Sequence, residues 1–469
     1  MFKAVTIAAL LVSTFHAAPA AASPQQASRA ADFLNSIGVN LHIQDEWDTA
    51  YSDDANGGTW GALAGNAAYG PVQVNNTVTN VSKIIGAMRY LGISHVRAGL
   101  VFPYIRDRLL AVMQGIPNLK IHDQVGITSN ATMSSQLDVA GSVAWAIESF
   151  EGLNEAAMNA SYAGQYGAGA DCQFQIDLHN ALQWFRPAHN MWAPLLAPTV
   201  SGQNWSDFDA LAPCAWASDA ANGHFYSDSV GPTQQLQYDW PFVIKDAPGG
   251  APVYDSESGF VTNNATPRGM TEDVAAKRLV QSLLGFYSHG VTRSFLYELV
   301  DENPQNPQLN DDWNSDEVEQ HLGLFRNDYS AKAGASMLHA QSQILADNSG
   351  SASNFNPGSL SYTLSGMPST ASSLLLQKAD GTFVLAIWDE PSNLYTQATD
   401  NSWGYENGTG SHTVNVTFDR APSSTAIYDT FNVNSHDGNG NPAPIGIQYS
   451  ANQTWLGLTD HPLYLMIRP

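Results

Sequence analysis

Short apolar segments alternate with helix-like segments over residues 30–347, and this alternation limits the possible folds more than any other feature of the sequence. Parallel strands need a long crossover between them, which is usually a helix, so the alternation indicates βα units around a parallel sheet. We expect strands at residues 37–41, 95–100, 119–125, 146–153, 195–200, 223–226, 252–256 and 294–299. Eight such units predict an α/β fold, a closed (β/α)8 TIM barrel.

The pattern changes after residue 347. Residues 348–361 are rich in Ser, Asn and Gly, and the rest of the chain alternates apolar and polar residues between frequent turn signals. Period-two alternation is typical of half-buried antiparallel strands. We expect a smaller C-terminal domain, an antiparallel β-sandwich over residues 348–469, with strands near residues 373–377, 383–388, 412–418 and 463–467.

The first 22 residues predict export. Lys3 precedes the apolar residues 4–12, and small residues fill positions 17–22, as in a secretory signal peptide. The apolar run is too short to cross a bilayer, and no later stretch approaches the roughly 20 apolar residues of a spanning helix. We expect a secreted protein, extracellular or periplasmic, with residues 1–22 removed and no membrane span.

The chain has two cysteines, Cys172 and Cys214. In an exported protein, an even pair of cysteines indicates a disulfide rather than two free thiols. The alternative is a thiol nucleophile or a metal ligand, but no His/Cys cluster of suitable spacing lies nearby. We therefore predict a Cys172–Cys214 disulfide.

Charge and composition limit the classes of partner that the protein is expected to bind. The chain has 43 acidic and 19 basic residues, a formal charge of −24, and such a surface repels phosphate backbones. Nucleic acid is therefore not expected as a partner, and anionic polysaccharides are disfavoured less firmly. No pattern calls for a cofactor or a metal ion. The acidic loop 301–317 does not match the EF-hand calcium pattern, so a solvated loop is the preferred interpretation. The oligomeric state is open.

Two glutamates occupy the positions where a barrel of this kind places its chemistry. Catalytic groups project from the C-terminal ends of barrel strands. Glu155 follows the fourth predicted strand and Glu257 follows the seventh. Hydrolysis of a glycosidic bond needs one protonated carboxyl for the leaving oxygen and one ionised carboxyl for the cationic sugar carbon. The two glutamates supply such a pair if the barrel brings them together.

At these residues the chain resembles the clan A glycoside hydrolases, which share a (β/α)8 barrel. Asn154-Glu155 matches the clan's Asn-Glu motif after strand four, and residues 256–259, Ser-Glu-Ser-Gly, match the nucleophile segment after strand seven. The resemblance implies that Glu155 is the general acid/base and Glu257 the nucleophile. It also implies that Asn154 bonds the sugar 2-hydroxyl.

Further positions extend the resemblance across the barrel. Arg97 on strand two matches the clan's support for the nucleophile, and His224 and Tyr226 after strand six match a substrate-binding His and a Tyr near the nucleophile. The chain departs from many relatives at Ala156, where they carry Pro, and at Tyr297-Glu298, where they offer a Trp platform. The second departure leaves open which sugar is held.

Each of these residues has a structural alternative. His224 is equally explained as a core histidine, and Arg97 as an ion-pair partner of Glu151; both roles are compatible for Arg97. Glu298, after strand eight, is either a contact for a sugar hydroxyl or half of a salt bridge at the rim. The order of Arg97, Asn154, Glu155, His224, Tyr226 and Glu257 along the strand ends is the reason for preferring the catalytic interpretation.

The sequence therefore predicts a secreted, retaining glycoside hydrolase that cleaves β-glycosidic bonds of a neutral oligo- or polysaccharide. Relatives with this architecture include cellulase-like, xylosidase-like and glucuronidase-like enzymes, and nothing in the sequence selects among them. Two alternatives remain. One is a non-catalytic carbohydrate-binding protein on the same barrel, and the other is a transglycosylase, in which a sugar intercepts the covalent intermediate.

Overall fold

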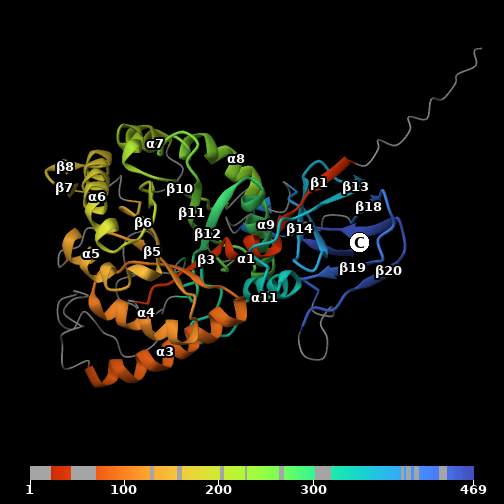
Figure 1. Cartoon of the computed structure of the whole chain (residues 1–469), viewed down its shortest axis with the longest axis horizontal. Coiled ribbons are helices and arrows are strands. Elements are labelled where there is room, and N and C mark those ends of the chain that lie inside the picture. Colours follow the sequence, from red (N-terminus) through yellow and green to blue (C-terminus); the bar gives the residue numbers. More distant parts are fainter. Residues whose placement is uncertain are drawn as a thin grey trace, which may run out of the picture.

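A computed structural model describes most of the chain, arranged as a barrel beside a β-sandwich (Figure 1). The described residues are 23–43, 70–126, 131–155, 161–200, 205–227, 230–263, 269–301, 318, 320–391, 396–397, 403–405, 411–432 and 441–469. The proposed signal peptide and nearly all of the loop 301–317 lie outside these residues. The predicted fold class, a TIM barrel with a smaller antiparallel β-sandwich, is confirmed.

The barrel is an eight-stranded parallel sheet with the order β10-β11-β12-β3-β4-β5-β6-β9. Its strands are β3 (Ile37–Asn40), β4 (His95–Ala98), β5 (Lys120–Gln124), β6 (Ile147–Glu151), β9 (Leu195–Leu196), β10 (Ala221–His224), β11 (Val253–Ser258) and β12 (Val291–Leu296). A bridge between Leu196 and Ala220 joins the two ends of the sheet. Every predicted barrel strand is present, and because all are parallel, their C-terminal ends open on one face.

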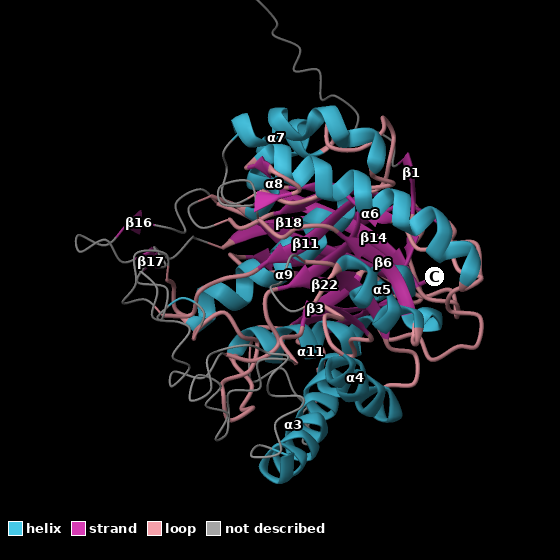
Figure 2. Ribbon diagram, turned by 90° about the vertical axis from the view of Figure 1, so that its left-hand side faces the viewer, coloured by secondary structure: helices cyan, strands magenta, loops and turns pink. Residues whose placement is uncertain are grey.

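Helices lie around the outside of the sheet, as Figure 2 shows, and all of them except α1 come after a barrel strand in the chain. They are α1 (Ala30–Asn35), α3 (Gly70–Leu91), α4 (Pro103–Gly115), α5 (Met133–Gly141), α6 (Ala168–Ala188), α7 (Trp205–Leu211), α8 (Pro232–Val243), α9 (Glu272–Ser288) and α11 (Ala333–Leu345). Side-chain capping fixes the start of α9. In α9, the Thr271 hydroxyl accepts a hydrogen bond from Val274 N at 3.3 Å, and Glu272 and Asp273 lie at the positive end of the helix dipole.

A glycine allows the segments that follow the seventh and eighth barrel strands to approach each other closely. A Cβ atom added to Gly259, just after β11, would lie 2.1 Å from the Tyr297 carbonyl oxygen. Only glycine permits this approach. The segment that carries Glu257 is thereby packed against the segment that leads into Glu298.

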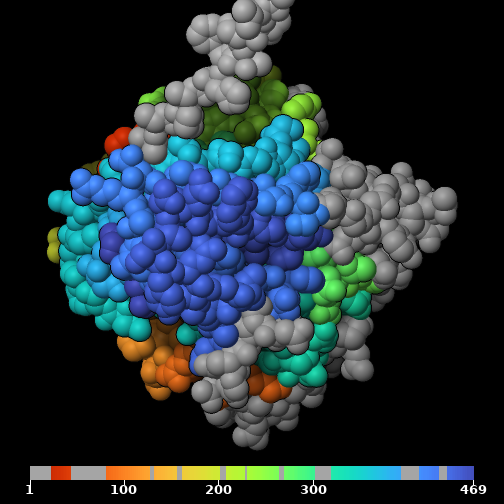
Figure 3. Space-filling model, turned by 90° about the vertical axis from the view of Figure 1, so that its right-hand side faces the viewer, coloured from red at the N-terminus to blue at the C-terminus, as the bar shows by residue number. Residues whose placement is uncertain are grey.

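The sandwich consists of a four-stranded sheet, β1-β13-β18-β21, and a six-stranded sheet, β2-β14-β15-β22-β19-β20. Its strands are β1 (Ser23–Gln26), β2 (Ser28–Arg29), β13 (Ser359–Ser365), β14 (Ala371–Gln377), β15 (Phe383–Asp389), β18 (His412–Phe418), β19 (Ser424–Asp429), β20 (Gly446–Tyr449), β21 (Gln453–Leu458) and β22 (Leu463–Arg468). Two-stranded sheets form from β7 (Ser161–Tyr162) with β8 (Gln165–Tyr166), and from β16 (Thr396–Gln397) with β17 (Trp403–Tyr405). Figure 3 looks onto the sandwich end of the molecule, which the C-terminal strands cover.

The first described residues belong to the sandwich. β1 pairs antiparallel with β13, and β2 pairs parallel with β14, before the chain enters the barrel at α1. Residues 23–29 carry no apolar–polar alternation that would predict a strand in either domain. The residues of β1 are Ser-Pro-Gln-Gln, and all four are exposed. Pairing to an existing edge, not burial, makes them a strand.

Strand β15 contributes side chains to the cores of both domains. All seven of its residues are buried. Leu385 and Ile387 pack into the core of the sandwich, whereas Val384, Ala386 and Trp388 pack into the core of the barrel. A strand that is apolar on both faces must be covered on both sides, which accounts for its unbroken hydrophobic run.

Polar contacts add to this apolar interface. The Gln281 amide on α9 donates to the carbonyl oxygens of Asp389 at 2.7 Å and Asp460 at 2.8 Å. Lys277, one helical turn earlier, forms a buried 2.9 Å ion pair with Asp460. α9 is therefore one of the elements that fix the sandwich to the barrel, together with α8 and α11, which contact the sandwich through Thr233 and Gln341.

Replacing Lys277 with alanine is expected to lower the free energy of unfolding by about 3 kcal/mol. The buried Asp460 carboxylate then loses the lysine and keeps His461 as its ion-pair partner. The matched control is Lys245→Ala. Lys245 also forms a 2.9 Å ion pair, with Asp209, but both side chains are largely exposed, so its loss should cost less than about 1 kcal/mol. Urea unfolding of the two variants measures the difference. Equal stabilities would contradict the assigned role of the buried pair.

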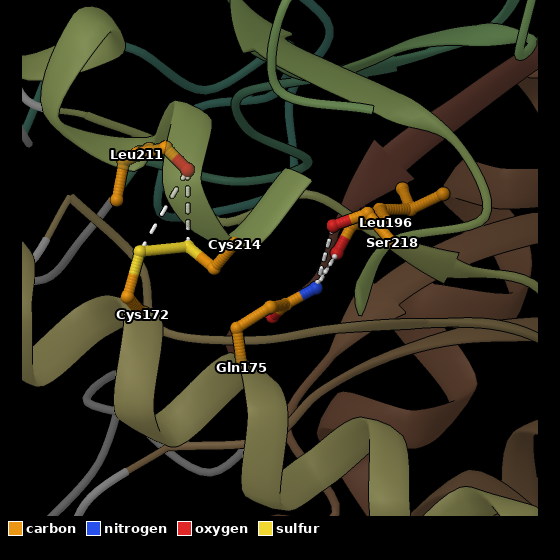
Figure 4. The surroundings of a disulfide bond; sticks show 6 residues. All are labelled: Cys172, Gln175, Leu196, Leu211, Cys214 and Ser218. Carbon is orange, nitrogen blue, oxygen red and sulfur yellow. Dashed lines mark hydrogen bonds between the residues drawn. A yellow bond between two sulfur atoms is a disulfide. The ribbon is translucent and has the colours of Figure 1, made fainter. Parts of the chain in front are cut away.

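The predicted disulfide between Cys172 and Cys214 is confirmed, with a Cα–Cα distance of 5.3 Å. It joins α6 to the short 3-10 helix at residues 212–217, as Figure 4 shows. Close by, the Gln175 amide donates to Leu196 O and to the Ser218 hydroxyl, both at 2.9 Å. These contacts tie α6 to the segments around the fifth barrel strand.

Replacing both cysteines with serine is expected to destabilise the protein. The bond closes a loop with a sequence separation of 42, and the entropy of the unfolded loop makes such a crosslink worth about 4 kcal/mol. Thermal unfolding of the Cys172→Ser/Cys214→Ser variant should show a lower midpoint than the oxidised protein. An unchanged midpoint would mean that the crosslink does not restrict the unfolded chain.

Among the described residues, none of the helices combines the length and the apolar character needed to cross a membrane.

Candidate active site

Glu257 lies near the end of β11, the seventh barrel strand, and is 6% exposed. Its Oε1 accepts a hydrogen bond from Arg97 Nη1 at 2.7 Å, and its Oε2 accepts one from the Tyr226 hydroxyl at 3.0 Å. Both donors hold the carboxylate in one orientation. A carboxylate fixed by a guanidinium and a phenol is suited to act as an anion.

Glu155 lies just beyond β6, the fourth barrel strand, and is half-buried. Its backbone has a φ of 43°, in the left-handed region that side chains other than glycine seldom adopt. Its amide N donates to the Thr199 hydroxyl at 3.2 Å. Its Oε1 lies 2.6 Å from Nδ1 of His224, at the end of β10. A strained turn held by tertiary contacts is common at functional sites.

The barrel brings the two glutamates together. A carboxylate oxygen of Glu155, a ring nitrogen of His224 and a carboxylate oxygen of Glu257 all lie within 4.8 Å of one another. The two carboxyl groups of retaining glycosidases stand about 5–5.5 Å apart, and those of inverting enzymes about 6.5–9.5 Å apart. An approach of one oxygen from each carboxyl to within 4.8 Å is compatible with the shorter spacing.

The same three side chains offer donor atoms for a metal ion, but their geometry is that of hydrogen bonds. Nδ1 of His224 lies 2.6 Å from Glu155 Oε1. Two ligands of one tetrahedral ion, each at about 2.1 Å from it, would stand about 3.4 Å apart. The pair would have to separate before both atoms could ligate an ion.

Arg97, on β4, is the central cation of the site and is almost fully buried. Its Nε and Nη2 donate to both oxygens of Glu151, at 2.7 and 3.0 Å. Its Nη2 also donates to Asn154 Oδ1 at 2.5 Å, and its Nη1 donates to Asn40 Oδ1 at 2.8 Å and to Glu257. The sequence offers two roles for Arg97, a contact with Glu257 and an ion pair with Glu151. In the structure, Arg97 contacts both carboxylates.

Glu151, on β6, is a third carboxylate close to Glu155 and Glu257, and it is fully buried. Burial would raise its pKa, but the charge of Arg97 and a bond from His122 outweigh burial and lower the pKa well below its usual range. His122 Nε2 lies 2.7 Å from Glu151 Oε2, and burial lowers the pKa of His122. The two hydrogen bonds from Arg97 and the lowered pKa indicate that Glu151 is ionised and accepts hydrogen bonds.

His224 lies between the two glutamates. Its Nδ1 is 2.6 Å from Glu155 and 3.5 Å from Glu257, and its Nε2 is 3.1 Å from the Ser256 hydroxyl. Burial would lower the pKa of His224, but the charge of Glu257 and the hydrogen bond to Glu155 raise it above its ordinary value. His224 thus contacts both glutamates, and both of its ring nitrogens have polar partners.

The remaining two predicted residues lie at the edge of this cluster. Asn154 is exposed, and because Arg97 holds its Oδ1, its amide nitrogen faces the other way as a donor. Glu298 follows β12 and is buried, with its Oε2 3.2 Å from His42 Nδ1. The structure thus gives Glu298 a histidine partner, and its contact with a sugar stays a prediction.

Ser256, His122 and His42 belong to the site and are absent from the sequence prediction. The register between β10 and β11 shifts, so that Gly223 pairs with Asp255 but His224 pairs with Glu257. Because of this bulge, the neighbouring residues Ser256 and Glu257 both make contacts inside the site. Strict alternation places neighbours on opposite faces of a strand, so no signal in the sequence pointed to Ser256.

The comparisons with known proteins support the fold. Neither a protein-family model nor a curated protein matches the chain. Solved structures do. A monomeric β-xylosidase from Caulobacter crescentus has a TM-score of 0.57 at 10% identity, covering 95% of this chain and 98% of its own. A GH39 enzyme from Xanthomonas axonopodis pv. citri has a TM-score of 0.53 at 12% identity, covering 98% and 100%. A glucosidase from Croceicoccus marinus has a TM-score of 0.52 at 11% identity, covering 82% and 91%. These likenesses show that the barrel and the sandwich together form an architecture found in solved glycosidases.

Proposed function

We propose that this protein is a secreted, retaining glycoside hydrolase that cleaves β-glycosidic bonds of a neutral oligo- or polysaccharide. The observation that carries the proposal is the approach of Glu155 and Glu257 to within 4.8 Å at the C-terminal face of the barrel. A pair at that spacing leaves no room for a water between carboxylate and sugar on the nucleophile side, so the carboxylate itself attacks.

Glu257 acts as the nucleophile. Arg97 and Tyr226 hold its two oxygens, so it attacks the anomeric carbon from a fixed position and forms a glycosyl ester. Glu155 gives its proton to the leaving oxygen during this step and afterwards takes a proton from the water that hydrolyses the ester. Asn154 offers its amide nitrogen to the sugar 2-hydroxyl, as predicted from the sequence.

The charge of the protein favours a neutral substrate. A net charge of −24 disfavours polyanions. The names of the structural neighbours, xylosidase and glucosidase, make β-xylosides and β-glucosides the first substrates to test. Glu298, paired with His42 at the ends of the eighth and first barrel strands, is proposed as a contact for a sugar hydroxyl.

The proposal of export is supported by the sequence pattern of residues 1–22, which predicts a signal peptide, and by the disulfide, because disulfides persist in oxidising compartments. We assign residues 30–347 to the catalytic barrel and residues 348–469 to an accessory sandwich, to which residues 23–29 add two strands.

The test is a panel of aryl β-glycosides, including the xyloside and the glucoside, together with neutral β-linked polysaccharides. The wild type should release product from at least one of them, and Glu155→Ala and Glu257→Ala should lose that activity. Binding of a polysaccharide without turnover would instead support the non-catalytic alternative. Full activity in both variants would refute the proposed function.

A further inference from the structure

The Ser256 hydroxyl lies between His224, which contacts the proposed acid/base Glu155, and the buried carboxylate of Glu151. Ser256 Oγ lies 3.1 Å from His224 Nε2 and 3.3 Å from Glu151 Oε1. Ser256 is fully buried. The chain Glu155, His224, Ser256, Glu151 therefore runs from the proposed acid/base to the carboxylate that anchors Arg97.

The direction of the hydrogen bonds in this chain follows from counting protons. Glu151 is ionised by Arg97 and accepts only, so the contact between Ser256 and Glu151 needs the serine proton. A hydroxyl has one proton, so Ser256 has only lone pairs to offer His224. The contact at His224 Nε2 is then a hydrogen bond only if Nε2 carries a proton.

The other ring nitrogen of His224 faces Glu155. With Nε2 protonated, Nδ1 and Glu155 Oε1, 2.6 Å apart, share a single proton. That proton lies either on Glu155, with a neutral ring accepting it, or on Nδ1, with an imidazolium donating to the carboxylate. The net charge of the pair is zero in both cases.

We propose that Ser256 and Glu151 are positioning residues that keep a proton on His224 Nε2, so that Nδ1 is the atom through which Glu155 holds and recovers its catalytic proton. The inference rests on the proposed function of Glu155. It gives His224 a role in proton transfer in addition to the substrate binding implied by the sequence resemblance.

The protons balance over a reaction cycle. In the first step, the shared proton moves to the leaving oxygen as the Glu257 carboxylate forms a bond to the anomeric carbon. A bare Nδ1 then faces a carboxylate oxygen at hydrogen-bond distance, which is repulsive. In the second step, the attacking water gives one proton to this pair, its oxygen bonds the anomeric carbon, and Glu257 leaves as a carboxylate.

Charged groups on every element around His224 influence its proton. Glu155 comes from the loop after β6, Asp255 and Glu257 from β11, and Arg97 from β4. Glu155 and Glu257 favour the charged ring, and Arg97 opposes it. Loss of the acceptor at Nε2 also disfavours the charged ring, so Ser256→Ala should lower the pKa of His224.

The first experiment is NMR spectroscopy of the wild-type protein labelled with 15N-histidine, with the His224 signals assigned by their loss in His224→Gln. Nε2 should carry a proton throughout the pH range of activity, whereas Nδ1 should change its protonation with pH. A neutral His224 with a proton on Nδ1 and none on Nε2 would overturn the inference. This measurement needs no substrate, so its failure is distinct from a failure of the proposed function.

The second experiment compares Ser256→Ala with Ser282→Ala. Ser282 is also buried, and its hydroxyl donates to Arg278 O of the same helix at 2.8 Å. Ser256→Ala should shift the Nε2 signal towards the deprotonated form and move the basic limb of the pH profile of kcat/KM to lower pH. It should also lower kcat roughly tenfold, which is the effect expected from the loss of one buried hydrogen bond. Ser282→Ala should change none of these. An unchanged pH profile and tautomer in Ser256→Ala would refute the role of Ser256.

Discussion

Replacing Glu257 with alanine is expected to lower kcat by about 10⁴-fold or more, because without the carboxylate no glycosyl ester forms. The fold should survive, since Arg97 keeps both of its bonds to Glu151. Azide should partly restore cleavage of an activated aryl β-glycoside by entering the space that the carboxylate leaves. Because it attacks from the side of the missing nucleophile, the product should be the α-glycosyl azide.

Glu272→Ala is the matched control for this variant. Glu272 begins α9 on the outside of the barrel, is partly exposed, and pairs with Arg326. The same substitution there should leave kcat and the azide response unchanged. A Glu257→Ala variant that retains more than about a tenth of wild-type kcat would remove Glu257 from the mechanism, since nucleophiles account for far larger factors.

Replacing Glu155 with alanine is expected to lower kcat by about 10²–10⁴-fold on substrates with poor leaving groups, the usual contribution of a general acid. The loss should be much smaller for the first step with a dinitrophenyl glycoside, whose leaving group needs no proton. The ester on Glu257 should then accumulate, because no base activates water. Azide, which needs no base, should relieve this block and give the β-glycosyl azide.

The stereochemistry of the two azide products separates the two roles. Glu155→Ala should give retention and Glu257→Ala should give inversion, since each lacks a carboxylate on a different side of the sugar. The reverse assignment of products would mean that the roles of the two glutamates are exchanged. An equal loss of activity with good and poor leaving groups in Glu155→Ala would argue against an acid role.

The sequence predicts the barrel well because its strands are buried and continuous. Each of the eight predicted strands is present, although β9 is only Leu195–Leu196 and shorter than predicted. Beyond Leu196, a backbone bond from Ala197 to Ala220 closes the barrel and ends the regular pairing. The N-terminal strands β1 and β2 were not predicted, because their partners lie more than 300 residues away.

Part of the site also followed from the sequence, since strand order alone brings distant strand ends to one face. Arg97, Glu155, His224 and Glu257 come together in this way. The connecting residues did not follow. Ser256 enters the site through a bulge, and His122 contacts Glu151 inside the barrel, where register and not pattern decides the contacts. The pairing of Arg97 with Glu151, by contrast, was one of the two roles that the sequence offered for Arg97.

The central claim, that Glu155 and Glu257 act on one sugar with the spacing of a double displacement, is tested most directly by the anomer that forms first. Proton NMR can follow the hydrolysis of a β-glycoside that the wild-type enzyme cleaves, before mutarotation mixes the anomers. The carboxyl separation of this site predicts that the β-anomer appears first. Initial release of the α-anomer would contradict the mechanism.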